Sequence, residues 1–119
     1  MQCTDDYDVI VYRVLVYLYA CLKRRIVFAD DTFRAAVRKN VESDEYFVSI
    51  LHMMQEETLI RGLVFAHAWG NEYVLASDLH DVEITPDGIH YLTENIRMQK
   101  IKDALKDAAD IVAQLASLL

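Results

Sequence analysis

The sequence predicts a mainly α-helical domain with one small β-hairpin, an α+β fold. Three observations support this fold class: apolar residues recur at helical spacing through most of the chain, one central stretch alternates instead, and Gly70-Asn71 follows that stretch. The length of 119 residues is typical of a single domain, and 54% hydrophobic with 26% charged residues is a globular composition. We therefore expect one hydrophobic core.

Three helices are expected in the first half of the chain. The first covers residues 5–24, where apolar residues spaced by three and four form a buried face. The second covers residues 31–40, with Phe33 toward the core. Ser43 can cap the third, and Asp44 suits the positive end of its dipole. The core face of this third helix consists of Phe47, Ile50, Leu51 and Met54.

A hairpin and a fourth helix follow. Residues 63–69 alternate in the manner of a strand, Gly70 and Asn71 suit a two-residue turn, and residues 73–75 return. Thr85 and Pro86 then mark a helix start, as cap and first helical residue. Gly88 permits a close backbone approach, and Asn95 is the expected end. The predicted buried stripe of this helix is Ile89, Leu92 and Ile96.

The last helix is expected over residues 98–118 and has the most regular pattern in the chain. Its apolar residues are spaced alternately by 3 and 4, which is a heptad seam. The seam either packs against its own domain or pairs with a second copy in a homodimer. Its members are Met98, Ile101, Leu105, Ala108, Val112, Leu115 and Leu119.

The order of these elements, three helices, a hairpin and a capped helix, is that of a winged helix, a helix-turn-helix variant with a β-ribbon. Distinctive segments are residues 5–7 (DDY), 9–12 (VIVY), 17–23 (YLYACLK), 84–95 (ITPDGIHYLTEN) and 98–102 (MQKIK). In these segments the chain resembles the YjcQ family, small winged-helix-like proteins of Gram-positive bacteria and their phages. The resemblance implies a winged helix-turn-helix-like domain over residues 1–97 and an additional C-terminal helix over residues 98–119. It implies no activity and no site residues.

Charge is unevenly distributed along the chain. Residues 13–41 contain seven Lys or Arg and two acids, whereas residues 42–96 contain eleven acids and Arg61 alone. The expected third helix would therefore meet the phosphates of DNA with like charge, which disfavours DNA binding through it. The basic residues either contact a nucleic acid or acidic partner or form a solvated surface. They are Lys23, Arg24, Arg25, Arg34, Arg38 and Lys39.

No motif in the sequence indicates catalysis, a cofactor or a metal. The four histidines show no HxxxH or HExxH spacing, and the two cysteines show no CxxC spacing. There is no GxSxG and no glycine-rich phosphate loop. We therefore expect no enzyme, no cofactor and no metal site. The histidines are His52, His67, His80 and His90.

These observations predict a noncatalytic interaction or regulatory module that acts mainly through contacts with a protein partner. The expected contact face lies on the third helix around Glu45, His52, Met53 and Glu56. The alternative is a DNA-binding transcriptional regulator of a phage or mobile element, and a small enzyme is a third hypothesis. Residues 9–22 are interrupted by Arg13 and too short for a membrane span, and acidic residues stand where a secretory signal is basic. We expect a cytoplasmic protein with no membrane contact.

Overall fold

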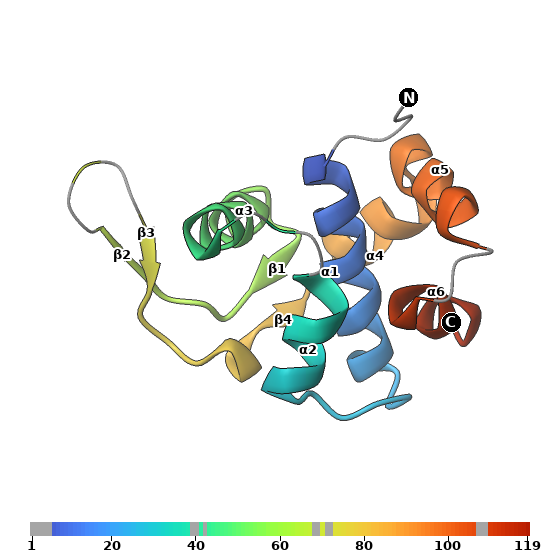
Figure 1. Cartoon of the computed structure of the whole chain (residues 1–119), viewed down its shortest axis with the longest axis horizontal. Coiled ribbons are helices and arrows are strands. Elements are labelled where there is room, and N and C mark those ends of the chain that lie inside the picture. Colours follow the sequence, from blue (N-terminus) through green and yellow to red (C-terminus); the bar gives the residue numbers. More distant parts are fainter. Residues whose placement is uncertain (1–5, 39–40, 42, 68–69, 71–72, 107–109) are drawn as a thin grey trace.

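The computed structural model describes residues 6–38, 41, 43–67, 70, 73–106 and 110–119. Within these ranges the fold is mainly α-helical with small antiparallel sheets, which confirms the predicted class (Figure 1). No helix in these ranges combines the length and apolar character that a membrane span requires. The elements are α1 (Asp6–Leu22), α2 (Asp30–Val37), α3 (Asp44–Glu56), β1 (Ile60–Arg61), β2 (Phe65–His67), β3 (Tyr73–Leu75), the 3₁₀ turn η1 (Leu79–Asp81), β4 (Glu83–Ile84), α4 (Pro86–Glu94), α5 (Ile96–Leu105) and α6 (Ile111–Ser117).

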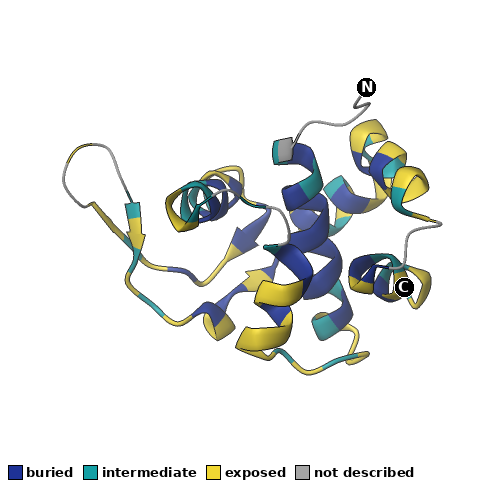
Figure 2. Ribbon diagram, viewed as in Figure 1, coloured by how far each residue is buried: buried dark blue, intermediate teal, exposed yellow. Residues whose placement is uncertain are grey.

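Helix α1 is the centre of the fold. The other helices surround it in Figure 1, and α1 contacts α2, α3, α4, α5, α6 and β4. Residues 10–18 are buried on every side of the helix (Figure 2). The face predicted from the apolar spacing is therefore only part of the buried surface. A helix that is apolar all round is typical of a position inside a core.

Arg13 is a charge in the middle of this buried helix. Its Nη1 donates to both carboxylate oxygens of Asp110, at 2.9 and 2.8 Å, and lies 3.4 Å from the carbonyl oxygen of Ala36. The side chains of Arg13 and Asp110 are only 8% and 6% exposed. Asp110 also caps α6 by accepting the N–H of Val112 at 2.8 Å. One buried ion pair thus joins α1, α2 and α6.

The expected continuous helix over residues 98–118 is wrong. Helix α5 ends at Leu105 and α6 begins at Ile111, because the carboxylate of Asp110 caps a new helix while it pairs with Arg13. The heptad pattern arises because both helices turn an apolar face into the same core. Of the seam residues, Met98, Ile101, Val112 and Leu115 are buried, Leu105 and Leu119 are half-buried, and Ala108 lies outside the described residues. The buried members are not available to pair with a second copy.

The first three helices begin within one residue of the predicted positions, and α1 and α2 end earlier than predicted. The cap of α3 is confirmed, since Ser43 Oγ accepts the N–H of Tyr46 at 3.2 Å. Helix α2 begins at Asp30 and ends at Val37, short of the predicted residue 40.

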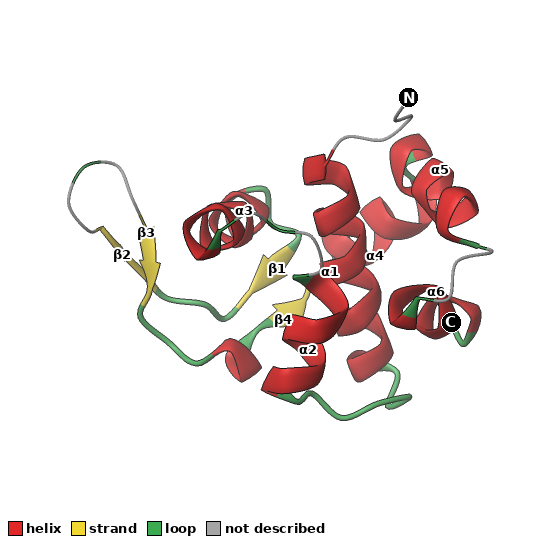
Figure 3. Ribbon diagram, viewed as in Figure 1, coloured by secondary structure: helices red, strands yellow, loops and turns green. Residues whose placement is uncertain are grey.

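The predicted hairpin is present, but its register differs from that of a two-residue turn (Figure 3). His67 pairs with Tyr73, whereas a turn at residues 70–71 would pair His67 with Val74. Gly70 has the expected positive φ of 75°, and Asn71 lies outside the described residues. The predicted two-residue turn is therefore wrong, because it would shift the pairing of the two strands by one residue.

A second strand pair, β1 with β4, forms the base of the same hairpin and was not predicted. Ile60 pairs with Ile84 and Arg61 with Glu83. Between the two strand pairs, Gly62 has a φ of 99°, and a Cβ there would lie 2.2 Å from the carbonyl oxygen of Asp81. Glycine is therefore required where the two arms of the hairpin approach each other.

Helix α4 begins and ends as predicted, but its buried residues differ from the predicted buried stripe. The hydroxyl oxygen of Thr85 accepts the N–H of Gly88 at 3.0 Å, and Asn95 ends α4 and caps α5. Leu92 is buried as expected, whereas Ile96 is 71% exposed and contradicts the predicted stripe. Ile96 is the first residue of α5, so the turn at Asn95 carries it away from the core face of α4.

We predict that breaking the buried pair costs far more stability than breaking an exposed one. Arg13→Met or Asp110→Asn alone should lower the free energy of unfolding by about 3–5 kcal/mol, because each leaves a buried group without its partner. Arg61→Gln, which removes the exposed Arg61–Glu83 pair, is the control and should cost less than about 0.5 kcal/mol. Urea denaturation followed by circular dichroism measures both. Equal losses in the three variants would contradict the assignment.

A second prediction concerns Gly88, where α4 meets the chain that leaves α3. A Cβ at this position would lie 2.2 Å from the carbonyl oxygen of Leu59. Gly88→Ala should therefore destabilise the fold by about 1–3 kcal/mol, although alanine is the better helix former. The control is the reverse exchange, Ala35→Gly, at an exposed position of α2. It isolates the effect of helix propensity, and it should destabilise the fold by about 1 kcal/mol because glycine is the poorer helix former. A Gly88→Ala variant that melts above the parent protein would refute the close contact.

Candidate binding groove between α3 and α4

An open groove of about 880 Å³ lies between the end of α3 and helix α4, with the start of α1 at one side. Carboxylates line it from two elements: Glu56 and Glu57 at the end of α3, and Asp87 and Glu94 on α4. Among the described residues that line the groove there is no Lys or Arg. The groove is therefore a site of negative potential that attracts cations.

The turn that forms the floor of the groove is held in an unusual backbone conformation. Thr58 has a φ of 63°, which is rare for a β-branched residue. Its hydroxyl donates to Asp87 Oδ2 at 2.8 Å, and its carbonyl oxygen accepts the hydroxyl of Thr85. These bonds join the end of α3 to the start of α4 and fix the two walls of the groove relative to each other.

Tyr7 and Tyr91 add aromatic surface to the groove. Burial raises the pKa of both phenols, and the nearby negative charges of Asp8 and Glu57 raise each pKa further, while the Arg97 guanidinium partly lowers the pKa of Tyr91. Both rings are therefore neutral at physiological pH. Met53, 40% exposed, supplies apolar surface beside them. The groove thus combines carboxylates with aromatic and thioether side chains.

Asp8 brings a buried carboxylate close to the two tyrosines. It is 6% exposed, and its Oδ2 lies 3.8 Å from Nη1 of Arg97. Its Oδ1 has no hydrogen-bond partner among the described residues. The negative charge of Asp8 is therefore only partly compensated.

Comparison with known proteins gives one match. A sequence model of the family described as YjcQ protein matches residues 12–111. The chain belongs to the YjcQ family. Comparisons of this YjcQ protein with curated proteins and with solved structures each returned no significant match. The matched range includes both Arg13 and Asp110, and all of the groove except Tyr7.

The acidic face predicted on α3 is only partly assembled in this YjcQ protein. Met53 and Glu56 line the groove as part of one surface. Glu45 is exposed but lies eleven residues before Glu56, about 16 Å along the helix. The ring of His52 stacks on Tyr73 of the hairpin at 3.7 Å, and its Nδ1 lies 3.6 Å from Oε1 of Glu56. The signal that sequence reasoning missed was the convergence of Tyr7, Thr58, Asp87, Tyr91 and Glu94 from three segments.

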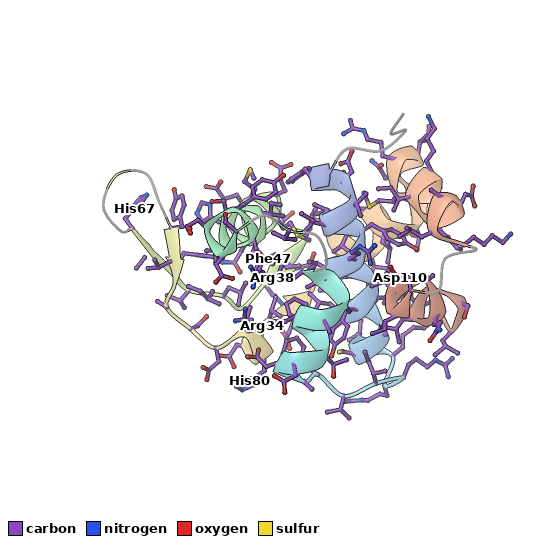
Figure 4. The ribbon with its side chains drawn as sticks, in the orientation of Figure 1. Arg34, Arg38, Phe47, His67, His80 and Asp110 are labelled. Atoms are coloured by element: carbon purple, nitrogen blue, oxygen red, sulfur yellow. The ribbon has the colours of Figure 1, made fainter. Side chains whose placement is uncertain are left out.

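The predicted basic residues do not form one surface. Arg34 pairs with Asp30 at 3.7 Å, and Arg38 pairs with Asp44 at 3.0 Å. Helix α2 runs back along α1, so residues 23–25 lie nearer the acidic start of α2 than its end, where Arg38 lies (Figures 1 and 4). Lys23, Arg24 and Arg25 remain exposed, and Lys39 lies outside the described residues.

The histidines are dispersed over the fold. His67 lies on the hairpin and His80 at η1, far apart in Figure 4, and His90 lines the acidic groove. In the described part of the chain, no three His, Cys, Asp or Glu side chains are grouped as a metal ion requires.

Cys21 does not have the environment of a nucleophile. It is partly buried at the end of α1, and burial raises the pKa of its thiol to about 11. A raised pKa lowers the thiolate fraction near neutral pH.

We predict slow alkylation of Cys21 in the folded protein. Relative to an ordinary pKa of 9.0, the shift to about 11 lowers the thiolate fraction at pH 8 about 100-fold, and the greater nucleophilicity of the thiolate offsets part of this. In a Cys3→Ser variant at pH 8, iodoacetamide should therefore label Cys21 about 10-fold more slowly in the folded protein than in the same protein unfolded in urea. Equal rates in the two states would contradict the buried environment.

Proposed function

We propose that this chain is a noncatalytic interaction module of winged-helix type, and that its α3–α4 groove binds a partner segment rich in Lys and Arg. The observation that carries the proposal is the lining of the groove, in which Glu56, Glu57, Asp87 and Glu94 lie together and the described lining residues include no Lys or Arg. Glu56 also contacts the imidazole of His52, whose Nδ1 lies 3.6 Å from Oε1 of Glu56. The order of three helices, a hairpin and a capped helix supports the winged-helix assignment.

The side chains of the groove suit a cationic segment in two ways. The carboxylates supply charge-assisted hydrogen bonds to an ammonium or guanidinium group. The faces of Tyr7 and Tyr91 supply cation–π contacts, which are strongest for Arg. The net charge of −7 would also accelerate encounter with a basic partner at low salt.

The groove is suited to bind without rearrangement. The hydrogen bonds of Thr58 to Asp87 and Thr85 hold its two walls together. A preformed groove spares the partner the free-energy cost of ordering the binding site.

DNA binding by a transcriptional regulator is the competing function. The exposed cations at residues 23–25 would have to supply the phosphate contacts, since Arg34 and Arg38 already pair with acids and α3 carries acids. A regulator that works through these contacts would show binding to duplex DNA that weakens steeply with salt.

Fluorescence anisotropy tests the two functions side by side. A labelled Arg-rich and Lys-rich peptide should bind at low salt, and a peptide with Glu in place of the cations should not. The Glu56→Lys/Glu57→Lys variant should weaken peptide binding about 10-fold or more, because it reverses two charges in the groove. The matched control is Asp78→Lys/Asp81→Lys, which changes net charge equally at the distant η1 and should weaken binding about 2-fold or less.

Two outcomes would overturn the proposal. One is an equal loss of peptide affinity in the groove variant and in the control, since that would mean a nonspecific effect of net charge. The other is duplex DNA that binds the parent protein more tightly than the peptide does.

A further inference from the structure

A second hollow, separate from the acidic groove, lies among four helices and opens to solvent. It has a volume of about 200 Å³ and is lined from α1, α4, α5 and α6. Its walls are mainly apolar, with Val16, Leu92, Ala116 and Leu119 among them. A cavity of about 150 Å³ in another protein takes up benzene, so this volume accommodates one ring with a short substituent.

Tyr12 of α1 adds a polar group to the lining of the hollow. Tyr12 is 2% exposed and lines the hollow, and its hydroxyl makes no hydrogen bond to another residue that the structure describes. Burial raises the pKa of Tyr12 to about 12, so the phenol keeps its proton at neutral pH. It can therefore donate a hydrogen bond to a ligand.

One charged side chain lies at this hollow. Lys102 of α5 is exposed, is the only charged residue among the described lining, and has no acidic partner in the described part of the chain. The nearby amide of Gln99 is occupied, since its Nε2 donates to the carbonyl oxygens of Leu92 and Thr93 at 2.9 and 3.2 Å. The polar groups left for a ligand are thus the cation of Lys102 and the hydroxyl donor of Tyr12. The negative charges of Asp103 and Asp110 also act on Tyr12, so Lys102 is the group that favours an anionic ligand.

We propose that this hollow is a binding site for a small carboxylic acid with a single ring or a branched alkyl body. The body fills the space between α1, α4 and α6, and the carboxylate lies toward Lys102, where the hydroxyl of Tyr12 can donate to it. The site does not depend on the acidic groove. Helix α4 contributes Leu92 and Thr93 to this hollow and Tyr91 and Glu94 to the groove.

Phenylacetate and its neutral analogue phenylacetamide test the site, because they match in size and differ in charge. In ¹H–¹⁵N spectra of the whole chain, phenylacetate should shift the amides of Val16, Thr93, Gln99 and Ala116 with a dissociation constant of about 1 mM or below. Phenylacetamide should bind at least about fivefold more weakly. No saturable shift of these amides with phenylacetate overturns the proposal, and so does equal affinity for the two compounds.

Variants assign the contacts. Lys102→Met should weaken phenylacetate binding at least about fivefold and leave phenylacetamide binding unchanged. Lys100→Met is the matched control on the same helix, because Lys100 is exposed and outside the lining. Ala116→Phe should fill the hollow and abolish binding of both compounds. An unchanged affinity in Lys102→Met, or an equal loss in Lys100→Met, overturns the role given to Lys102.

Discussion

The ion pair between Arg13 and Asp110 is the contact on which the arrangement of the helices depends. Placing a guanidinium in the middle of a buried helix carries a large desolvation penalty, which only a well-bonded counter-ion offsets. Asp110 supplies two short hydrogen bonds, and its second role as the cap of α6 fixes where that helix begins. The position of α6 against α1 is therefore specified by charge as well as by apolar packing.

Helix α3 divides its surface between the core, the hairpin and the groove. Its core face includes Phe47 and Met54, while the ring of His52 lies against Phe65 and Tyr73 of the hairpin. The amide of Gln55 bonds to both backbone groups of Leu63 and holds the hairpin base to the helix. What remains free at the end of α3 is the acidic surface that faces α4. Glu56 at the end of α3 thus borders both the hairpin and the groove, and Glu57 lies in the groove with the acids of α4.

The sequence predicted best what is decided locally. The caps at Ser43 and Thr85 depend on residues within three positions, and both are confirmed, as is the end of α4 at Asn95. The hairpin was recognised from alternation, but its register depends on the turn. The pair β1–β4 was missed because two-residue strands carry no detectable alternation.

What depends on distant residues was not predictable from one sequence. Arg13 interrupts an apolar stretch and so indicates a buried charge, but nothing local points to a partner 97 residues away. The seam from Met98 to Leu119 misled for a related reason: two short helices that bury their faces in one core produce the same spacing as one long helix. The groove draws on α1, α3 and α4 together, so composition revealed its charge and not its shape.

The central position of α1 has a consequence for how the chain folds during synthesis. The ribosome produces α1 before every helix that covers it, and the counter-ion of Arg13 emerges 97 residues later. Until then α1 is an apolar helix whose Arg13 has no counter-ion. The contacts that complete the fold join residues that are far apart in the sequence. Such a topology favours late, concerted docking over stepwise growth.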